Sequence, residues 1–397
     1  MQPRNGSGLR HIALLIGQMG FGGTETQVSL LARELHGRGF VVDVLLLSEG
    51  GVHEPTLRAA GIGVHHLGFS RRPSDPAAVL QNLRAFVRMV SLLRSLRPDV
   101  LHAFLLMSHV LGAPAARLAR VPVMIAGCRV LSDARHVRRS PRWRFVLGGA
   151  LTPIIDHVVA NAVAVADDAS TVFGVPSHKL SVIYNGMPDS AFDAVEPEDI
   201  DTDLPVVVCL ARMRPEKGHG FLLDAAALLS KQGRPCTLVL VGDGSEEGRL
   251  KEHASSMDID VRFAGAIEDP RAWLARADIV VLPSISEGLS NAVMEAMAQG
   301  RPIVATAVGG TPELLEDRGV LVPPADPVAL SQGIASLLRD PELAAHFGTV
   351  ARAWAVKHLD VTSMVEAHVK LYRRLLERRC ARLPRRGRPR GSSSARS

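Results

Sequence analysis

The feature that most constrains the fold is a regular alternation of short apolar runs with longer amphipathic segments along nearly the whole chain. Runs such as 41–47 (VVDVLLL) and 237–242 (TLVLVG) are rich in Val and Leu, and helical periodicity fills the segments between them. Nearly continuous apolar strands separated by helices predict parallel sheets that are covered on both faces. The expected strands lie at 11–17, 41–47, 99–103, 121–126, 157–160, 180–183, 205–211, 237–242, 261–265, 279–283, 302–306 and 319–322. The expected helices include 25–37, 76–96, 220–231, 291–299 and 327–338.

The alternation breaks once, in an acidic, proline-containing stretch near 187–204 that has no strand pattern. A chain of 397 residues also has the length of two domains. We therefore expect two doubly wound, Rossmann-like α/β domains, which bind ligands in the crevice at the carboxyl ends of their strands. The expected division is an N-terminal Rossmann-like domain, a linker, a C-terminal Rossmann-like domain, a helix that can return to the first domain, and a basic disordered tail. These segments span 1–190, 191–204, 205–360, 361–378 and 379–397, respectively.

The net charge of +6 belongs to the tail rather than to the domains. Residues 379–397 carry seven arginines and no acid, so subtracting them from +6 leaves −1 for the rest of the chain. Such a tail either contacts anionic lipid or nucleic acid or is a solvated end without a dedicated partner.

No segment of the sequence is expected to cross a membrane. The longest stretch without Asp, Glu, Lys or Arg is 100–116, which is shorter than the roughly 20 apolar residues of a span. The apolar run after Arg10 leads directly into glycines, so it is interpreted as a strand entering a loop and not as a signal peptide. The four cysteines show no CxxC spacing, which favours a reducing compartment without a zinc site or disulfide framework.

The strongest chemical signal is the pair Glu287 and Glu295 in the segment 284–313. A strand ends at Pro283, a loop presents Glu287, and a helix is expected to start near Ser290. The free amides of that helix start favour an anion between the two carboxylates. This pattern predicts a holder for a sugar–diphosphate–ribose molecule. Taken singly, Glu287 can instead complement the helix dipole and Glu295 can be a solvated helix residue, and a glycosidase pair is a further alternative.

A second signal, Arg212 and Lys217 in the segment 211–218 (ARMRPEKG), follows the first strand of the second domain. Both residues are expected at the sheet edge that presents Glu287. Arg binds phosphate oxygens in a bidentate manner and Lys adds a compact charge, so the two can neutralise a diphosphate. Alone, they are also compatible with ordinary surface solvation.

The chain resembles the family-four retaining glycosyltransferases of the GT-B fold (glycosyl transferases group 1) over roughly residues 9–375. The specific segments lie in the second half, where the spacing of Glu287 and Glu295 is kept. They are ARMRPEKG (211–218), LVLVGDG (238–244), VRFAG (261–265) and SEGLSNAVMEAMAQGRPIVATAVGGTPEL (286–314). The matching segments of the first half are GGTETQV (22–28), RPDVLHAF (97–104), VVANAVAV (158–165) and VIYNGM (182–187).

The resemblance implies a GT-B fold, in which the two sheets face each other across a cleft. It also implies that residues 1–190 form the acceptor-side domain, that residues 205–360 form the nucleotide-sugar-binding domain, and that each matching residue has a role. Arg212 and Lys217 would bind the donor diphosphate, Glu295 the ribose hydroxyls and Glu287 the hydroxyls of the transferred sugar. The backbone of Gly288, Leu289 and Ser290 would complete the phosphate cradle. Gly22 and Gly23 would allow the first domain's loop to approach the diphosphate closely.

The resemblance also implies that His102 lies near the sugar and the acceptor. Many relatives have His-x-His at this place, whereas this chain has Phe104 at the second position. His102 can therefore also be a hydrogen-bonded structural residue. His109, in the following helix, can supply part of the role of the second histidine, which Phe104 replaces.

The implied reaction is transfer of a hexosyl-type sugar with retention of the anomeric configuration and without a metal or other cofactor. The acceptor hydroxyl attacks on the face from which the nucleotide leaves, and the protein stabilises the departing diphosphate and orients the acceptor. No Asp-x-Asp pair occurs where a metal would bridge the diphosphate. The donor is expected to be a nucleoside-diphosphate sugar, with UDP preferred and GDP open. The acceptor is a glycan or a lipid-linked glycan in cell-surface polysaccharide or glycolipid synthesis.

Five arginines and two aromatic residues in 135–145 (RHVRRSPRWRF) suit an anionic membrane surface, although an exposed basic helix start is an equal alternative. With the basic tail, this segment predicts a cytoplasmic protein that makes peripheral contact with the inner face of the membrane.

Other functions fit the sequence less well. A nucleotide-sugar epimerase would need further carboxylates and histidines, and a phosphorylase would need a pyridoxal lysine. A nicotinamide oxidoreductase would need the G-x-G-x-x-G fingerprint, which 17–23 lacks. A nucleic-acid-binding protein acting through the tail is the non-enzymatic alternative, which the charge of −1 on the rest of the chain disfavours.

Overall fold

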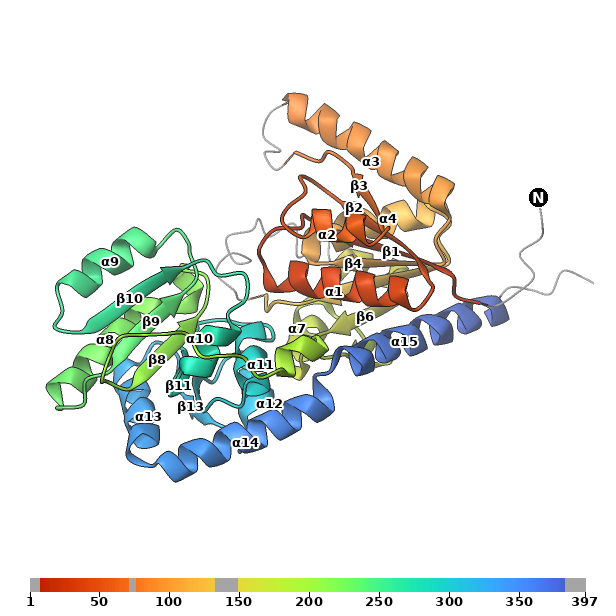
Figure 1. The fold of residues 1–397 in the computed structure, drawn as a ribbon. Coiled ribbons are helices and arrows are strands. Elements are labelled where there is room, and N and C mark those ends of the chain that lie inside the picture. Colours follow the sequence, from red (N-terminus) through yellow and green to blue (C-terminus); the bar gives the residue numbers. More distant parts are fainter. Residues whose placement is uncertain (1–7, 71–75, 133–148, 383–397) are drawn as a thin grey trace, which may run out of the picture.

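A computed structural model describes residues 8–70, 76–132 and 149–382 and contains two parallel sheets (Figure 1). In the seven-stranded sheet the order is β3-β2-β1-β4-β5-β6-β7, and in the six-stranded sheet it is β10-β9-β8-β11-β12-β13. All the pairings between neighbouring strands are parallel. The strands of the first sheet are β1 (His11–Ile16), β2 (Val41–Leu46), β3 (Gly63–His66), β4 (Val100–Phe104), β5 (Val123–Cys128), β6 (His157–Ala160) and β7 (Leu180–Val182). Those of the second are β8 (Val206–Leu210), β9 (Thr237–Val241), β10 (Asp260–Gly265), β11 (Ile279–Leu282), β12 (Ile303–Thr306) and β13 (Val320–Val322).

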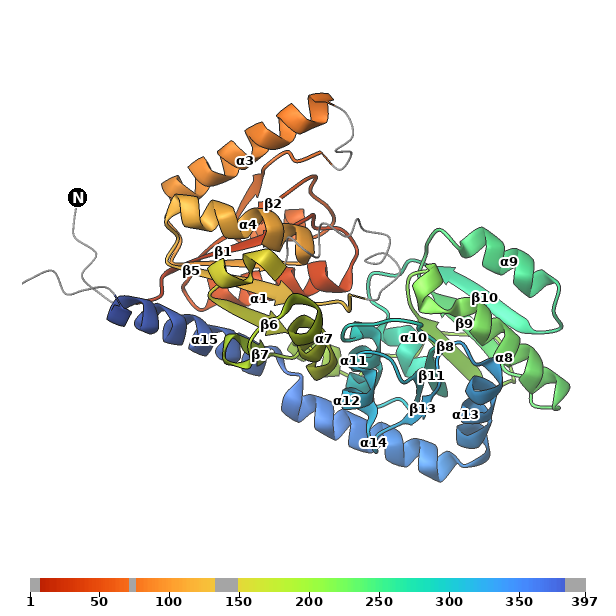
Figure 2. The same ribbon diagram turned by 180° about the vertical axis from the view of Figure 1, so that it is seen from behind.

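Helices cover both faces of each sheet, as Figures 1 and 2 show. With the first sheet lie α1 (Gly23–Gly37), α2 (Glu54–Ala59), α3 (Pro76–Leu96), α4 (Leu106–Ala119), η1 (Thr152–Ile154), α7 (Val163–Phe173) and η2 (Ser177–Lys179). The rest are η3 (Asp189–Phe192), η4 (Pro215–Lys217), α8 (His219–Lys231), α9 (Glu247–Ser255), α10 (Arg271–Arg276), α11 (Asn291–Ala298), α12 (Thr311–Leu315), α13 (Pro327–Arg339), α14 (Pro341–His358) and α15 (Val361–Arg382).

Successive residues of the central strands enter different hydrophobic cores. In β1, Leu14 packs in the core on one face of the sheet and Leu15 in the core on the other. In β8, Val208 and Val207 divide in the same way. Because both faces are covered, both sets of side chains must be apolar, which explains the continuous apolar runs. The expectation of two doubly wound parallel sheets is confirmed.

The C-terminal helix α15 lies against the first domain after α14 has crossed the second (Figures 1 and 2). Its residues Val365, Val369 and Tyr372 share a core with Leu31 of α1 and Ile12 of β1. The final helix thus ties the two domains together.

The expectation of disorder from residue 379 onward is wrong for its first four residues, because α15 continues to Arg382. Residues 379–382 contain no helix breaker, whereas Leu383 precedes Pro384, and a residue before proline is disfavoured in a helix. The remainder of the tail lies outside the described residues.

The segment expected as a linker forms no strand or α-helix between 193 and 205 and follows η3. It runs along the second domain, where Glu198 N donates to the Ala272 carbonyl at 3.0 Å and Arg262 donates to the Asp201 carbonyl at 2.5 Å.

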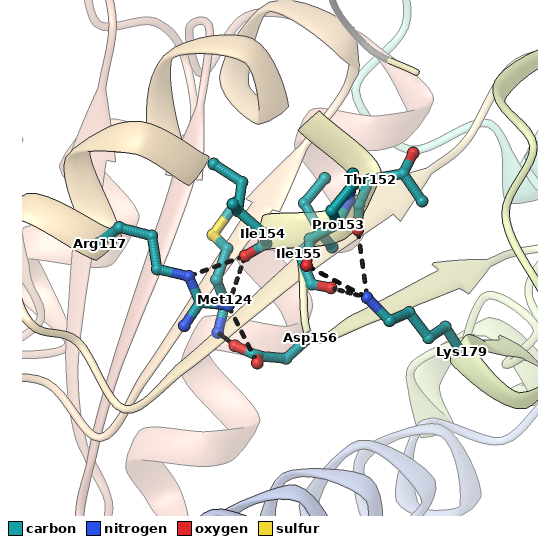
Figure 3. A network of polar contacts seen from close by, with 8 residues as sticks. All are labelled: Arg117, Met124, Thr152, Pro153, Ile154, Ile155, Asp156 and Lys179. Carbon is teal, nitrogen blue, oxygen red and sulfur yellow. Dashed lines mark hydrogen bonds and ion pairs between the residues drawn. The ribbon is translucent and has the colours of Figure 1, made fainter. Parts of the chain in front are cut away.

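A polar network fixes the 3₁₀ turn η1 before β6 (Figure 3). Arg117 of α4 donates to the Ile154 carbonyl and pairs with Asp156 at 3.0 Å, and Asp156 accepts from Met124 N at 2.9 Å. Lys179 Nζ donates to the Ile155 carbonyl at 2.8 Å. These contacts satisfy carbonyls that the short turn cannot pair itself.

Candidate active site

Lys217 and Glu287 meet at the carboxyl edge of the second sheet, where β8 and β11 end. Lys217 Nζ lies 2.5 Å from Glu287 Oε1, and Ser284 Oγ donates to the same oxygen at 2.7 Å. Gly218, with φ +70°, makes the turn after η4 possible, because a Cβ there would lie only 2.0 Å from the Pro283 carbonyl oxygen. The two residues that the sequence places 70 positions apart therefore form one ion pair.

Helix α11 begins directly beside this pair. Ser290 is its N-cap and accepts from Val293 N at 3.5 Å. Gly288 precedes the cap, and the Leu289 side chain is buried in the core of the second domain. The backbone amides at a helix start favour an anion, here beside the Lys217–Glu287 pair.

Glu295 lies in α11, one turn beyond its start, and is half-buried. Within the described ranges its carboxylate has no hydrogen-bond or ion-pair partner. Burial, with a smaller contribution from the charge of Asp269, raises the pKa of Glu295 to about 7. A half-buried carboxylate without a protein partner can accept hydrogen bonds from ligand hydroxyls.

Close backbone packing supports the Glu287–Gly288 loop. Gly310 N donates to the Gly288 carbonyl at 2.7 Å, and Gly309, with φ +54°, packs against the Glu287 carbonyl. On its other side, a Cβ at Gly288 would lie 2.0 Å from the Arg129 carbonyl oxygen of the first domain. The loop is thus clamped between the two domains, and side chains larger than hydrogen do not fit at 288.

Arg212 reaches the glycine loop of the first domain. Its Nη1 donates to the Phe21 carbonyl at 3.2 Å, and its Nε lies 4.0 Å from Asp243 Oδ1. Asn291, the first residue of α11, donates from Nδ2 to the Gly23 carbonyl at 3.3 Å. Gly22 and Gly23 therefore lie opposite both the arginine and the helix start.

A relay of side chains that the sequence does not single out extends this contact into the first domain. Arg129, which directly follows β5, donates to Asn185 Oδ1, and Asn185 Nδ2 donates to Asn291 Oδ1 at 2.8 Å. Asn291 then donates to Gly23, so each amide has a fixed orientation. Burial lowers the pKa of Arg129 to about 10. Asn185 belongs to the VIYNGM segment, whose resemblance to the family is the one sequence signal that points to it.

The domains make a second contact, which the sequence also does not predict. Glu313 of α12 accepts from the backbone amides of Val163 and Ala164, both at 2.9 Å, and from Tyr184 Oη at 3.0 Å. A carboxylate from one domain thereby caps the N-terminus of α7 in the other. Burial, followed by the negative charge of Glu313, raises the pKa of Tyr184 to about 12.

The histidines lie deeper than expected. His102 is fully buried; its Nδ1 lies 2.7 Å from Tyr372 Oη, and its ring stacks on Phe104 at 4.1 Å. Burial holds the pKa of His102 well below its usual range, so the ring is neutral. His109 donates to the Gly127 carbonyl at 3.1 Å in the core, and burial lowers its pKa to about 4. A role for His109 near the acceptor stays a prediction.

The parts of the chain that the structure describes contain no group of three or more His, Cys, Asp and Glu side chains arranged to hold a metal ion. In the same ranges, no helix has both the length and the apolar character needed to span a membrane. The basic segment 135–145 lies outside the described residues.

Two family models match the sequence. One, described as "Glycosyl transferases group 1", covers residues 204–340, and the other, "Glycosyltransferase Family 4", covers residues 21–190. The two matches correspond to the two sheets.

Curated proteins and solved structures show the same similarity. The chain is 29% identical over 222 residues to the lipopolysaccharide core biosynthesis glycosyltransferase LpsE of Rhizobium meliloti, covering 54% of this chain and 64% of that protein. It is 35% identical over 167 residues to the GDP-mannose-dependent α-(1-6)-phosphatidylinositol monomannoside mannosyltransferase of Mycolicibacterium smegmatis, covering 39% and 44%, respectively. The matches thus span less than two thirds of either relative. Anabaena HepE, solved with UDP-glucose, superposes with a TM-score of 0.78 at 23% identity and covers 91% of this chain and 98% of its own.

Proposed function

We propose that this chain, which belongs to the group 1 glycosyltransferases of the GT-B type, transfers a sugar from a nucleoside-diphosphate-sugar donor to a glycan or lipid-linked acceptor. The observation that carries the proposal is the meeting of Arg212, the Lys217–Glu287 pair and the start of α11 opposite the glycine loop. Two cations, a helix N-terminus and two carboxylates are the groups that a sugar diphosphate requires. In this proposal residues 205–360 bind the donor, residues 1–190 present the acceptor, and 191–204 link them.

The donor diphosphate binds between the two cations and the amides of Gly288, Leu289 and Ser290. Gly22 and Gly23 close over it from the first domain, because glycine permits close backbone approach. The transferred sugar hydrogen-bonds through its hydroxyls to Glu287. The ribose hydroxyls hydrogen-bond to Glu295.

The reaction proceeds with retention and needs no metal or other cofactor. The bond between C1 of the sugar and the diphosphate oxygen breaks, and the acceptor oxygen forms its bond to C1 on the same face. The acceptor proton passes to the departing diphosphate oxygen. Arg212 and Lys217 stabilise the charge that develops on the diphosphate, which is where fixed cations lower a barrier most.

His102 is part of the proposed site, near the sugar and the acceptor, and its imidazole packs on Phe104 and lies 2.7 Å from Tyr372 Oη. A His102→Ala variant with unchanged kcat/KM would remove His102 from the site and leave the donor residues in place.

UDP is the preferred nucleotide, supported by the fold similarity to Anabaena HepE, solved with UDP-glucose. GDP is the second choice, since one relative is named as GDP-mannose-dependent. The name of LpsE supports a role in surface polysaccharide or glycolipid synthesis. We propose a cytoplasmic reaction at the inner face of the membrane, where lipid-linked acceptors would be available.

The test is calorimetric titration of the full chain with UDP, GDP and ADP, and with the same nucleotides for Arg212→Ala and Glu295→Ala. Arg249→Ala, an exposed arginine of α9, is the matched control. Tight binding of one nucleotide, weakened at least about tenfold by both site variants and not by the control, supports the proposal. Selective nucleotide binding that survives both substitutions would place the donor site elsewhere. If none of the nucleotides binds, the chain has this fold without a donor site, and a scaffold role would replace the proposed activity.

A further inference from the structure

Arg129, which directly follows β5, is a cation that the first domain buries without a carboxylate. Only 5% of the residue is exposed, and among the described residues no acid pairs with it. Its Nη1 donates to Asn185 Oδ1, whereas its Nε has no hydrogen-bond partner in the same ranges. The Phe104 ring, 5.2 Å from Cζ, offsets only part of the cost of burying the charge. Stability thus does not explain the arginine, and its hydrogen bond to Asn185 points to another role.

The hydrogen bonds that start at Arg129 can run in one direction only. Because a guanidinium only donates, Asn185 must turn its Oδ1 to Arg129 and its Nδ2 away. That Nδ2 donates to Asn291 Oδ1 at 2.8 Å, and Asn291 Nδ2 in turn donates to the Gly23 carbonyl at 3.3 Å. A carbonyl only accepts, so the two ends of the chain of hydrogen bonds agree. We call these four residues the amide relay, in which Arg129 sets the orientation of both amides.

The amide relay crosses between the domains beside the start of α11. Arg129 and Asn185 lie in the first domain, and Asn291 is the first residue of α11 in the second. Gly23 lies in the glycine loop of the first domain, where a Cβ would be only 3.3 Å from Asn291 Nδ2. The relay therefore joins the two walls between which the proposed function places the donor diphosphate.

From this arrangement we propose that Arg129, Asn185 and Asn291 are positioning residues, which hold the glycine loop against the start of α11 in the orientation that the transfer reaction needs. Arg129 sets the polarity, Asn185 transmits it, and Asn291 fixes the Gly23 carbonyl. None of the three has to touch the reacting atoms, because a displacement of about 1 Å in such a support can slow a reaction about 10²-fold. The inference rests on the proposed function, since the loop matters for catalysis only if the donor binds there.

Asn185→Asp separates the orientation of the relay from the stability of the fold. The introduced carboxylate gives Arg129 the anionic partner that it lacks, so the fold should be at least as stable as the wild type. A carboxylate does not donate, so Asn291 must turn its Nδ2 toward it and present its Oδ1 to the Gly23 carbonyl, which repels that oxygen. We expect kcat/KM for the donor to fall at least about tenfold, while the urea midpoint does not fall.

Variants of Arg129 test the origin of the polarity. Arg129→Met leaves Asn185 free to turn its amide and should lower kcat/KM at least about tenfold. Arg129→Lys should retain more of the activity than Arg129→Met, because an ammonium group also only donates.

Hydrogen exchange gives a readout that does not need turnover. In Asn185→Asp the peptide that contains residues 18–26 should exchange faster than in the wild type, because the glycine loop loses its bond to α11. Asn82→Asp is the matched control. Asn82 is a half-buried residue of α3 whose Oδ1 accepts from Ser70 N, and a carboxylate preserves that bond. It should change neither the exchange of residues 18–26 nor kcat/KM.

Two outcomes would overturn the amide relay. Wild-type exchange of residues 18–26 in Asn185→Asp would show that the orientation of the amide does not hold the loop. A urea midpoint that falls together with kcat/KM would make Asn185 a group required for folding. A wild type that turns over no nucleotide sugar would instead contradict the proposed function, and the exchange of residues 18–26 would still decide the relay.

Discussion

Lys217 Nζ and Glu287 Oε1 lie 2.5 Å apart, in a pair to which Ser284 adds a second donor. The sequence suggests that these residues contact opposite ends of a donor, the diphosphate and the sugar. In the structure they first contact each other. A diphosphate that binds here must share Lys217 with Glu287, while Ser284 keeps the carboxylate oriented. In the proposed function, the pair therefore couples occupancy of the phosphate site to the position of the carboxylate that is proposed to bind the sugar.

Lys217→Met should lower kcat/KM for the donor by about 10²–10³-fold, because it removes a charge that is proposed to stabilise the leaving diphosphate. It should also destabilise the fold, since a half-buried Glu287 loses its partner. Lys217→Met/Glu287→Gln should recover stability without recovering activity. Donor turnover and urea unfolding are the measurements. Lys251→Met, which breaks an exposed pair with Glu247, is the control. Full activity of Lys217→Met would contradict the role of the lysine.

Gly288→Ala tests the close contact between the domains. The added Cβ would lie 2.0 Å from the Arg129 carbonyl oxygen, so the loop or the first domain must move. Overpacking of this kind costs about 1–3 kcal/mol and should lower kcat/KM at least about tenfold through the displaced amides of α11. Gly220→Ala is the matched control, because outside its chain neighbours and the backbone of its own helix no atom lies within 4 Å of the position that the new methyl group would take, and alanine favours its helix. Equal activity of the two variants would show that the clamp at 288 has no functional effect.

The sheets could be predicted from the sequence because their signal is local. Each central strand is apolar on both faces, as Leu14 and Leu15 illustrate, and such runs are visible without knowledge of the fold. Strand β3 could not be predicted, because its sequence GVHH is short and half polar and lies at the edge of the sheet. It is identified only by its pairing with β2, in which Val64 meets Val44.

The candidate site could be predicted only in part. Lys217 and Glu287 each follow a strand end, and parallel strands end at the same edge, so their proximity follows from the fold class. Glu313 and Asn185 could not be found in this way. Their contacts cross between domains and join residues more than 100 positions apart, so they depend on how the domains pack. The buried position of His102 likewise depends on α15, whose Tyr372 holds the imidazole while Phe104 covers it.

Glu313→Ala tests the second contact between the domains. It removes three hydrogen bonds to a carboxylate, from Val163 N, Ala164 N and Tyr184 Oη. With a net value of about 1 kcal/mol per bond, the loss should lower the thermal midpoint by several degrees. Because the partners lie in the other domain, small-angle scattering should also show a larger radius of gyration. Glu342→Ala is the control, since that exposed glutamate lies in the first turn of α14, where it complements the dipole of its own helix. An unchanged radius with a lowered midpoint would make Glu313 a local cap and not a link between the domains.

The raised pKa of Glu295 predicts how stability depends on pH. Burial raises it from an ordinary value of 4.5 to about 7, so between these values the folded protein binds more protons than the unfolded chain. The contribution of Glu295 to the free energy of unfolding must then fall as pH rises from about 4.5 to about 7, and stay low above. Glu295→Gln, which has no charge to bury, should be more stable than the wild type by about 1–3 kcal/mol at pH 8 and equal to it near pH 4.5. Urea unfolding over this range is the measurement, with Glu366→Gln on the exposed side of α15 as the control. If the wild type is more stable than Glu295→Gln at pH 8, the Glu295 carboxylate is stabilised by surrounding protein groups. It would then not be an unpaired acceptor available to a ligand.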